Sequence, residues 1–158
     1  MAGVERSYGL ASREQFEGLS GIELLQAMIR GELPAPPISK ALGMLLVEAE
    51  PGRAVFEGRP GPHLFNPLGS VHGGFALTLI DSAAGCAVHT ELDAGIGYTT
   101  VETKANMVRP VPSEGIVRCE GRVLSRGRQI ATAEAYLRSA DGKLLAHGTS
   151  TLIILGKR

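Results

Sequence analysis

The chain has 158 residues, a length that suits one domain with a sizeable hydrophobic core. Its 16 basic and 16 acidic residues cancel, and aromatic residues make up only 4% of the sequence, with no tryptophan. This balance argues against a nucleic-acid-binding protein, which needs excess positive charge or aromatic platforms for bases.

The first 15 residues, MAGVERSYGLASREQ, contain charges and lack the apolar stretch of a secretory signal. The longest apolar run of the sequence holds a carboxylate, Asp81, and is too short to span a bilayer. We therefore expect a cytoplasmic protein without a membrane partner. Cys86 and Cys119 lie far apart in the sequence, which predicts two small core residues and neither a disulfide scaffold nor a zinc site.

The strongest helix signal near the N-terminus covers residues 20–30, SGIELLQAMIR. Ser20 and Glu23 match a capping box, and apolar residues recur along one face of the predicted helix. Gly31 then ends the helix. A shorter helix is predicted over residues 12–16.

Proline determines the interpretation of the next stretch. Residues 33–37, LPAPP, cannot be helical, because proline lacks an N–H donor and clashes with the preceding turn. They predict an extended arm that leads into residues 38–42. We therefore divide the chain into an N-terminal helical extension, residues 1–40, and one further domain, residues 41–158.

Strand signals follow the arm and return near the C-terminus. Residues 43–50 and 53–58 are separated by Pro51-Gly52 and predict a hairpin. Four later stretches alternate polar and apolar residues; they are 98–108, 115–124, 129–138 and 144–155. Because short turns join these stretches, an antiparallel sheet is favoured.

A long helix is predicted between the two groups of strands, over residues 73–90, with a length of about 27 Å. Its apolar side chains cover every side of the helix, as expected of a helix that is buried all round. The sheet must then wrap around this helix. The fold class is therefore α+β, with the helix against the concave face of an antiparallel sheet.

One carboxylate, Asp81, interrupts the apolar helix. Burying a charge is unfavourable unless the charge is paired, hydrogen-bonded or used in chemistry, so Asp81 is the first candidate for a catalytic residue. Residues 72–74, His-Gly-Gly, lie about two turns earlier, at a helix start whose free N–H groups suit an anion. A buried acid and an anion-binding helix start are the parts of an acyl-transfer site.

Two other interpretations of these residues are weaker. Ser70, His72 and Asp81 do not indicate a catalytic triad, since the sequence lacks a Gly-x-Ser-x-Gly elbow. Cys86 and His89 lie one turn apart in an apolar helix, where core packing explains them better than a metal does. We therefore expect neither a metal nor a cofactor.

Four short motifs together resemble those of the hotdog-fold acyl-CoA thioesterases, over about residues 40–155. They are Asn66-x5-His72-Gly73-Gly74, Asp81 nine residues after His72, Thr100-Val101-Glu102 and Val108-Arg109-Pro110. The most similar subgroup is the PaaI type, from phenylacetate degradation, which includes the Arthrobacter-type 4-hydroxybenzoyl-CoA thioesterases. The resemblance implies a hotdog domain, a homodimer or a homotetramer built as a dimer of dimers, and active sites between subunits.

The resemblance also implies a role for each catalytic candidate. Asp81 is the nucleophile or the general base on water, and both roles are open to it. The N–H of Gly73 polarises the thioester carbonyl. His72 orients the loop or touches the thioester, Asn66 holds the water or the carbonyl, and Thr100 positions water from across the subunit interface.

Each of these candidates also has a purely structural interpretation. Asn66 is a common turn residue before proline, Thr100 is an ordinary β-branched strand residue, and Gly73 suits close helix–strand packing. His72 can be a structural histidine. The sequence also departs from the family at Gly85, where some relatives have a threonine or serine one turn after the acid.

The phosphates of coenzyme A require cations or free N–H groups at the mouth of the site. The candidates are Arg109, Ser125, Arg126, Gly127 and Arg128, the last four in a predicted tight turn. Apolar residues expected near the acyl tail are Leu64, Phe65, Leu68 and Phe75. The expected reaction is hydrolysis of an aromatic or medium-chain acyl-CoA to free acid and CoA. The alternatives are a non-catalytic acyl-CoA-binding protein and a hotdog hydratase or dehydratase.

Overall fold

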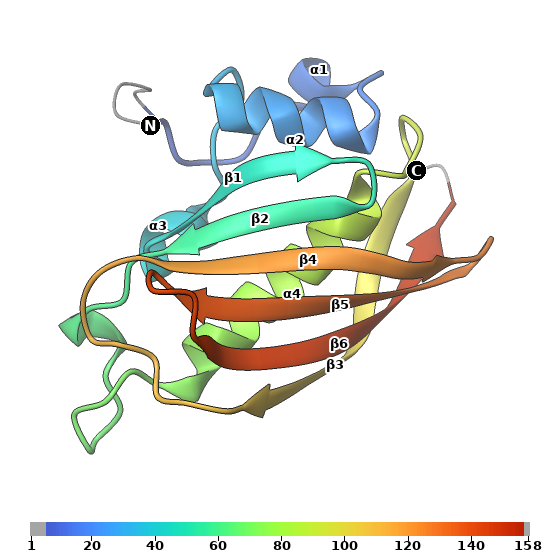
Figure 1. Ribbon diagram of the computed structural model, residues 1–158. Coiled ribbons are helices and arrows are strands. Elements are labelled where there is room, and N and C mark those ends of the chain that lie inside the picture. The colour runs from blue at the N-terminus through green and yellow to red at the C-terminus, as the bar shows by residue number, and fades with distance from the viewer. Residues whose placement is uncertain (1–5, 157–158) are drawn as a thin grey trace.

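A six-stranded antiparallel sheet wraps around one long helix in the computed structural model, which describes residues 6–156 (Figure 1). The helix is α4, Gly73–His89, and the strand order is β1-β2-β4-β5-β6-β3. The strands are β1 Met44–Glu50, β2 Arg53–Gly58, β3 Gly97–Met107, β4 Val117–Arg126, β5 Ile130–Ser139 and β6 Leu144–Leu155. The predicted α+β fold class is confirmed.

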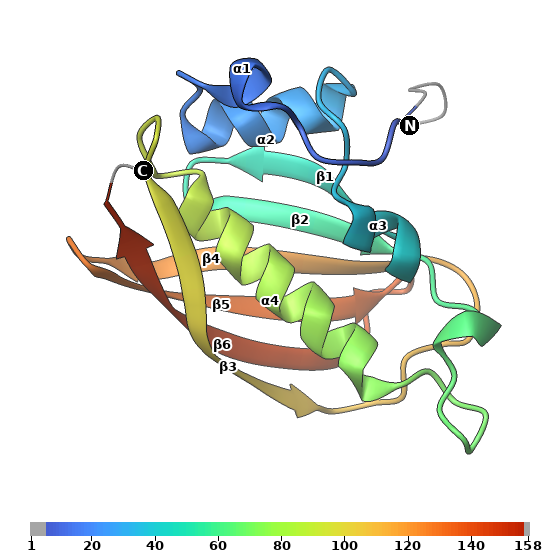
Figure 2. The ribbon, with the colours of Figure 1, turned by 180° about the vertical axis from the view of Figure 1, so that it is seen from behind.

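Helix α4 lies across the concave face of the sheet (Figure 2). The helix backbone reaches the sheet at Gly121 of β4, where an added Cβ would overlap the carbonyl of Ala83. Phe75, Leu79 and Ile80 are among the helix residues that the sheet buries. A glycine in the strand therefore fixes how closely the helix approaches, because no side chain intervenes.

The prediction that α4 is buried on every side needs a correction. Leu77 is 39% exposed, and Asp81 and Ser82 are only half-buried. The sheet covers a single face of the helix, so the opposite face depends on other parts of the chain. On that face lies the cavity described below.

The N-terminal helices pack on the β1 side of the sheet (Figure 1). Helix α1 spans Arg13–Phe16 and α2 spans Gly21–Arg30, as predicted. The Glu23 carboxylate accepts hydrogen bonds from the backbone N–H and the hydroxyl of Ser20, at 2.8 and 2.6 Å. The capping interaction inferred from the sequence is thus present.

The proline-rich arm is shorter than predicted, because Pro37 is the first residue of helix α3, Pro37–Leu42. Proline is tolerated there because the N–H that it lacks would have no intrahelical partner. The helix therefore crosses the predicted boundary between residues 40 and 41. A short 3-10 helix, Pro62–Leu64, precedes the loop that leads into α4.

The hairpin between β4 and β5 also differs from the prediction. Strand β4 continues to Arg126, opposite Ala131, after an irregularity in register between Val123 and Ser125. Ser125 and Arg126 are therefore strand residues, and the turn covers residues 127–129. With this bulge, the pairing of β4 with β5 continues two residues beyond the end of the strand that the sequence predicted.

Strands β1 and β3 are the two edges of the sheet. Helix α2 packs against β1, whereas β3 pairs only with β6 within the described residues. Val101 and Met107 of β3 are more than half exposed. An open strand of 11 residues with exposed apolar side chains can pair with another chain. None of the described helices is long and apolar enough to cross a membrane.

Candidate active site

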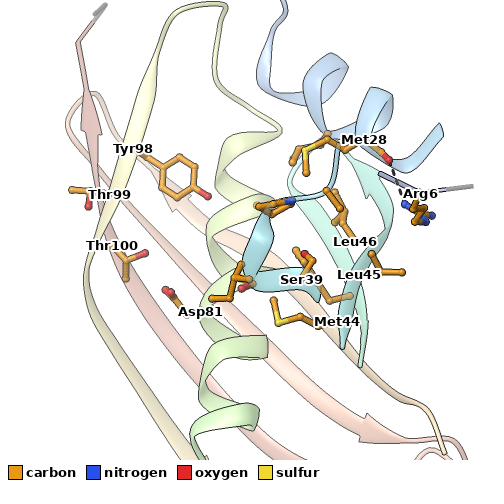
Figure 3. A pocket seen from close by; sticks show the side chains of 17 residues that line it. Arg6, Met28, Ser39, Met44, Leu45, Leu46, Asp81, Tyr98, Thr99 and Thr100 are labelled. Atoms are coloured by element: carbon orange, nitrogen blue, oxygen red, sulfur yellow. Dashed lines mark hydrogen bonds between the residues drawn. The ribbon is translucent and has the colours of Figure 1, made fainter. Parts of the chain in front are cut away.

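A cavity of about 470 Å³ lies between α4, the start of β3 and the N-terminal helices. Figure 3 shows Asp81, Tyr98 and Thr100 on one side of it and Met28 and Leu46 on the other. Asp81 is the only carboxylate among the described residues that line this cavity. The volume falls within the range of about 300–1,000 Å³ that is common for small-molecule sites.

Asp81 is oriented by two hydroxyl groups of the sheet. The Thr103 hydroxyl donates to Asp81 Oδ1 at 3.1 Å, and the Thr103 and Ser150 hydroxyl oxygens are 2.9 Å apart. Since the single hydroxyl hydrogen of Thr103 goes to Asp81, Ser150 donates to Thr103. Within the described residues, Asp81 Oδ2 has no hydrogen-bond partner, so one carboxylate oxygen is held and the other is left for a ligand.

A β-bulge explains why Thr103 faces Asp81. Thr100 pairs with Leu152 and Glu102 with Thr151, which leaves Val101 as the extra residue. Tyr98 and Thr100 face inward before the bulge, and Thr103 faces inward after it. Strict alternation along the strand would place Thr103 on the outer face, so the sequence pattern did not reveal it.

Tyr98 and Cys86 line the cavity beside Asp81. Burial raises the pKa of the Cys86 thiol to about 12, and burial likewise raises the pKa of Tyr98 well above its usual value. Both groups therefore stay protonated at neutral pH. Because the thiolate is the nucleophilic form of cysteine, Cys86 is not an activated nucleophile, which leaves the Asp81 carboxylate as the candidate reactive group on this side of the cavity.

The predicted residues before α4 form the start of the helix. His72 is the N-cap, and its Nδ1 accepts a hydrogen bond from the N–H of Gly74 at 2.8 Å. The N–H of Gly73 donates to no acceptor among the described residues, and Gly73 is exposed. The geometry thus gives His72 a capping role and leaves the Gly73 donor available to an anion.

Asn66 lies in the loop before α4 and does not line the Asp81 cavity. Its side-chain oxygen accepts hydrogen bonds from the N–H groups of Leu68 and Ser70, at 2.9 and 3.3 Å. This is the pattern of an Asx turn, in which the side chain holds its own loop. The turn interpretation accounts for the Asn66 oxygen.

Gly73 and Asp81 of one chain are too far apart to act on the same carbonyl. They are eight residues apart in one helix, which corresponds to about 12 Å along its axis. An oxyanion donor and a catalytic base must each lie about 3 Å from the reacting atoms. A single chain therefore holds two separated halves of the expected site.

The predicted coenzyme A residues lie at two ends of the molecule. Arg109 shares a hollow of about 230 Å³ with Gly73, and its guanidinium donates to the carbonyl of Leu144 at 2.9 Å. The hairpin residues, Ser125, Arg126, Gly127 and Arg128, lie by the C-terminal end of β6, where the N–H of Ile154 donates to the carbonyl of Gln129 (Figure 1). One chain does not gather these cations into a single site.

The residues expected near the acyl tail are also outside the cavity. Phe75 is 3% exposed and packs under Gly58 of β2, so it belongs to the core. Leu64 is buried in the same core. Phe65 and Leu68 are exposed in the loop before α4. None of the four lines the Asp81 cavity, whose apolar walls come from other segments.

This fold, with its acid on the central helix, defines the class of protein. A family model described as the thioesterase superfamily matches residues 68–146, which is half of the chain and includes Gly73, Asp81 and Thr100. The chain belongs to this superfamily. By class it is a thioester hydrolase.

Three similar proteins support this assignment. A Saccharolobus solfataricus protein that carries an esterase name is 36% identical over 122 residues, 77% of this chain and 85% of its own. Human acyl-coenzyme A thioesterase 13 is 27% identical, and the match covers 80% of this chain and 91% of the human protein. The structure of a phenylacetic acid degradation-related protein from Ralstonia eutropha has a TM-score of 0.74 at 28% identity. The match covers 82% of this chain and 98% of that protein. The expected hotdog fold is confirmed.

Proposed function

We propose that this protein hydrolyses the thioester of an acyl-CoA to a free acid and CoA, with Asp81 as the catalytic carboxylate. The observation that carries the proposal is the position of Asp81 as the only carboxylate on the described wall of a large cavity, in a chain of the thioesterase superfamily. The name of the human relative supports an acyl-CoA as the substrate. An aromatic or medium-chain acyl group suits a cavity of this volume. An acyl-CoA substrate also favours a cytoplasmic location for the protein.

Two routes use the same carboxylate. As a general base, Asp81 takes a proton from water while the water oxygen bonds to the thioester carbon; the C–S bond then breaks, and the CoA thiolate accepts the proton. As a nucleophile, Asp81 forms a mixed anhydride with the acyl group and releases CoA, and water then cleaves the anhydride. After a single turnover in H₂¹⁸O, ¹⁸O found in Asp81 by mass spectrometry identifies the anhydride route, since the general-base route places ¹⁸O only in the released acid. Because water opens the anhydride at either carbonyl, the anhydride route places ¹⁸O in Asp81 when water attacks the aspartyl carbonyl.

The separation of Gly73 from Asp81 supports an active site built from two chains. We infer a homodimer, or a homotetramer built as a dimer of such dimers, in which the open edge of β3 pairs with a second copy. The N–H of Gly73 from one chain then stabilises the oxyanion near Asp81 of the other. Arg109, which shares a hollow with Gly73, lies where it can attract the phosphates of CoA bound to the same composite site.

The proposed route requires no metal and no cofactor other than the CoA of the substrate. Hydrolysis is expected to persist after dialysis against EDTA. A complete loss that zinc or magnesium restores would contradict this part of the proposal. A hydratase reaction has less support, since histidine is absent from the described cavity lining.

The experiment is release of free thiol from a panel of aromatic and aliphatic acyl-CoA esters. Wild type is expected to turn over, and Asp81→Asn is expected to lower kcat by about 10²–10⁴-fold, the range for loss of a catalytic acid–base group. Asp93→Asn is the matched control, because Asp93 is an exposed acid in the loop after α4. Wild-type turnover in the Asp81→Asn protein would remove Asp81 from the mechanism.

A further inference from the structure

The far side of the Asp81 cavity is built by the N-terminal part of the chain. Leu25 and Met28 of α2, Pro36 of the arm and Met44 and Leu46 of β1 line it. Figure 3 shows Met28 and Leu46 across the cavity from Asp81. All of these residues precede residue 68, where the match to the thioesterase superfamily begins. The catalytic carboxylate and the opposite wall therefore come from different stretches of the sequence.

This wall is held in place by backbone hydrogen bonds. The N–H of Gly21, at the start of α2, donates to the carbonyl of Leu92 at 2.9 Å, which fixes α2 beside the end of α4. The N–H of Gly9 donates to the carbonyl of Ala35, and the N–H of Ala35 donates to the carbonyl of Ser7, both at 2.9 Å. The proline-rich arm is thus tied at Ala35 to the segment that contains Ser7 and Gly9.

The chemistry of the wall selects an apolar ligand. Its α2 and β1 side chains are leucine and methionine, and Leu25, Met44 and Leu46 are buried. The polar groups at this end are the hydroxyl of Ser39 and the guanidinium of Arg6, which donates to the carbonyl of Met28 at 3.3 Å. Met28 lines the cavity and is half-buried, and an unbranched methionine side chain can adapt its shape to an apolar ligand.

We propose that the N-terminal extension closes the acyl cavity and that Met28, together with Leu25 one turn earlier on α2, limits the length of the acyl tail. The proposal rests on the proposed acyl-CoA hydrolysis and deepens it. Residues 68–146 then supply the acid and the helix start, while α2 and the arm select among apolar acyl groups. Met28 is a specificity residue and takes no part in the chemical step.

The test measures kcat/KM for straight-chain acyl-CoA esters of increasing length. Met28→Ala is expected to move the optimum to longer tails, and Met28→Phe to shorter ones, with about a fourfold change for each methylene that gains or loses burial. Ile29→Ala is the matched control, because Ile29 is an apolar neighbour on α2 that does not line the cavity. Met28→Leu, a substitution of similar volume, is the control for loss of folding.

An unchanged length profile in Met28→Ala and Met28→Phe would overturn the inference. If wild type releases no thiol from any ester, the proposed function fails instead, and binding then tests the wall separately. In that case, calorimetric titration with free carboxylic acids of graded length is performed on wild type and both Met28 variants. A shift in the best-bound length supports the wall, and affinities that do not depend on residue 28 refute it.

Discussion

Asp81 is half-buried and, in the part of the chain that the structure describes, is held by only one of its two carboxylate oxygens. Thr103 and Ser150 orient one oxygen from the sheet, while the helix carries the group to the edge of the cavity. A carboxylate fixed by one oxygen keeps a constant direction toward a ligand, which favours reaction because orientation is settled beforehand. The hydroxyl of Thr103 is thus a positioning group, which does not itself line the cavity.

Thr103→Val tests this role. Removing the donor is expected to lower kcat by about tenfold or more, since a hydrogen bond to a charged group contributes about 1.5–3 kcal/mol. KM is expected to change little, because Thr103 lies outside the cavity lining. Thr103→Ser, which keeps the hydroxyl, is the control in steady-state assays. A valine variant with the kcat of wild type would show that Asp81 needs no such support.

His89 gives the protein a dependence of stability on pH. Burial at the end of α4, beside Tyr98, lowers the pKa of the His89 imidazole below its ordinary value of about 6.5. The unfolded chain then binds more protons than the folded one, so the contribution of His89 is complete above about pH 6.5 and is lost as the pH falls below it.

The free energy of unfolding is therefore expected to decrease as the pH falls below about 6.5, by at most about 1.4 kcal/mol per pH unit from this group. Urea denaturation at several pH values measures it. His89→Gln is expected to flatten this part of the profile, whereas His63→Gln, at an exposed position, leaves it in place. An unchanged slope in His89→Gln would assign the effect to other groups.

At the scale of elements, the contact between α2 and α4 depends on Gly21. A Cβ at this position would overlap the backbone carbonyl of His89, and neither backbone is free to move far. Overpacking of this kind is unfavourable by about 1–3 kcal/mol. Gly21→Ala is expected to lower the denaturation midpoint accordingly. Gly9→Ala is the control, since no atom lies near its added methyl group, and equal stability of both variants would contradict the close contact.

The sequence predicted most elements because their signals are local. The Ser20 cap, the proline-rich arm and the apolar run of α4 each have a direct physical cause, and the structure has each of them. Pro37 was misread because proline suits the first turn of a helix as well as an extended arm. The bulge at Val101 has no comparable signal in the sequence, so the position of Thr103 came only from strand pairing.

The candidate site was predictable in part, for a related reason. Asp81 stood out as a charge within an apolar helix, and Thr100 followed from the family motif; both line the cavity. Phe75 was assigned to the substrate because an aromatic residue beside Gly74 gives no sign of which side it faces. Met28 was missed since its contact with the cavity joins segments more than 50 residues apart.

At the scale of the whole molecule, the open edge of β3 leads to a prediction about assembly. If β3 pairs with a second copy, the solution mass is expected to be twice 16.6 kDa or a multiple of that. Val101→Lys introduces a charge beside this edge, which disfavours strand pairing, and is expected to shift the mass toward the monomer. Light scattering coupled to gel filtration measures it.

Leu10→Lys is the control for that variant, because Leu10 is an exposed apolar residue that shares a hollow with Leu24 of α2, the helix that packs against β1 at the opposite edge of the sheet. It is expected to keep the mass of wild type. A monomeric wild-type protein with full hydrolytic activity would contradict the composite active site.

Strand β3 has two roles that meet in one element: Tyr98 and Thr100 line the cavity, and the free edge of the same strand is open to a partner. Catalysis by a composite site of this kind follows the law of mass action. Activity per mole of protein is therefore expected to fall on dilution, once the protein concentration drops below the dissociation constant of the dimer. Assays at nanomolar enzyme would then underestimate the rate per site, and saturating substrate, by holding the two chains together, would restore it.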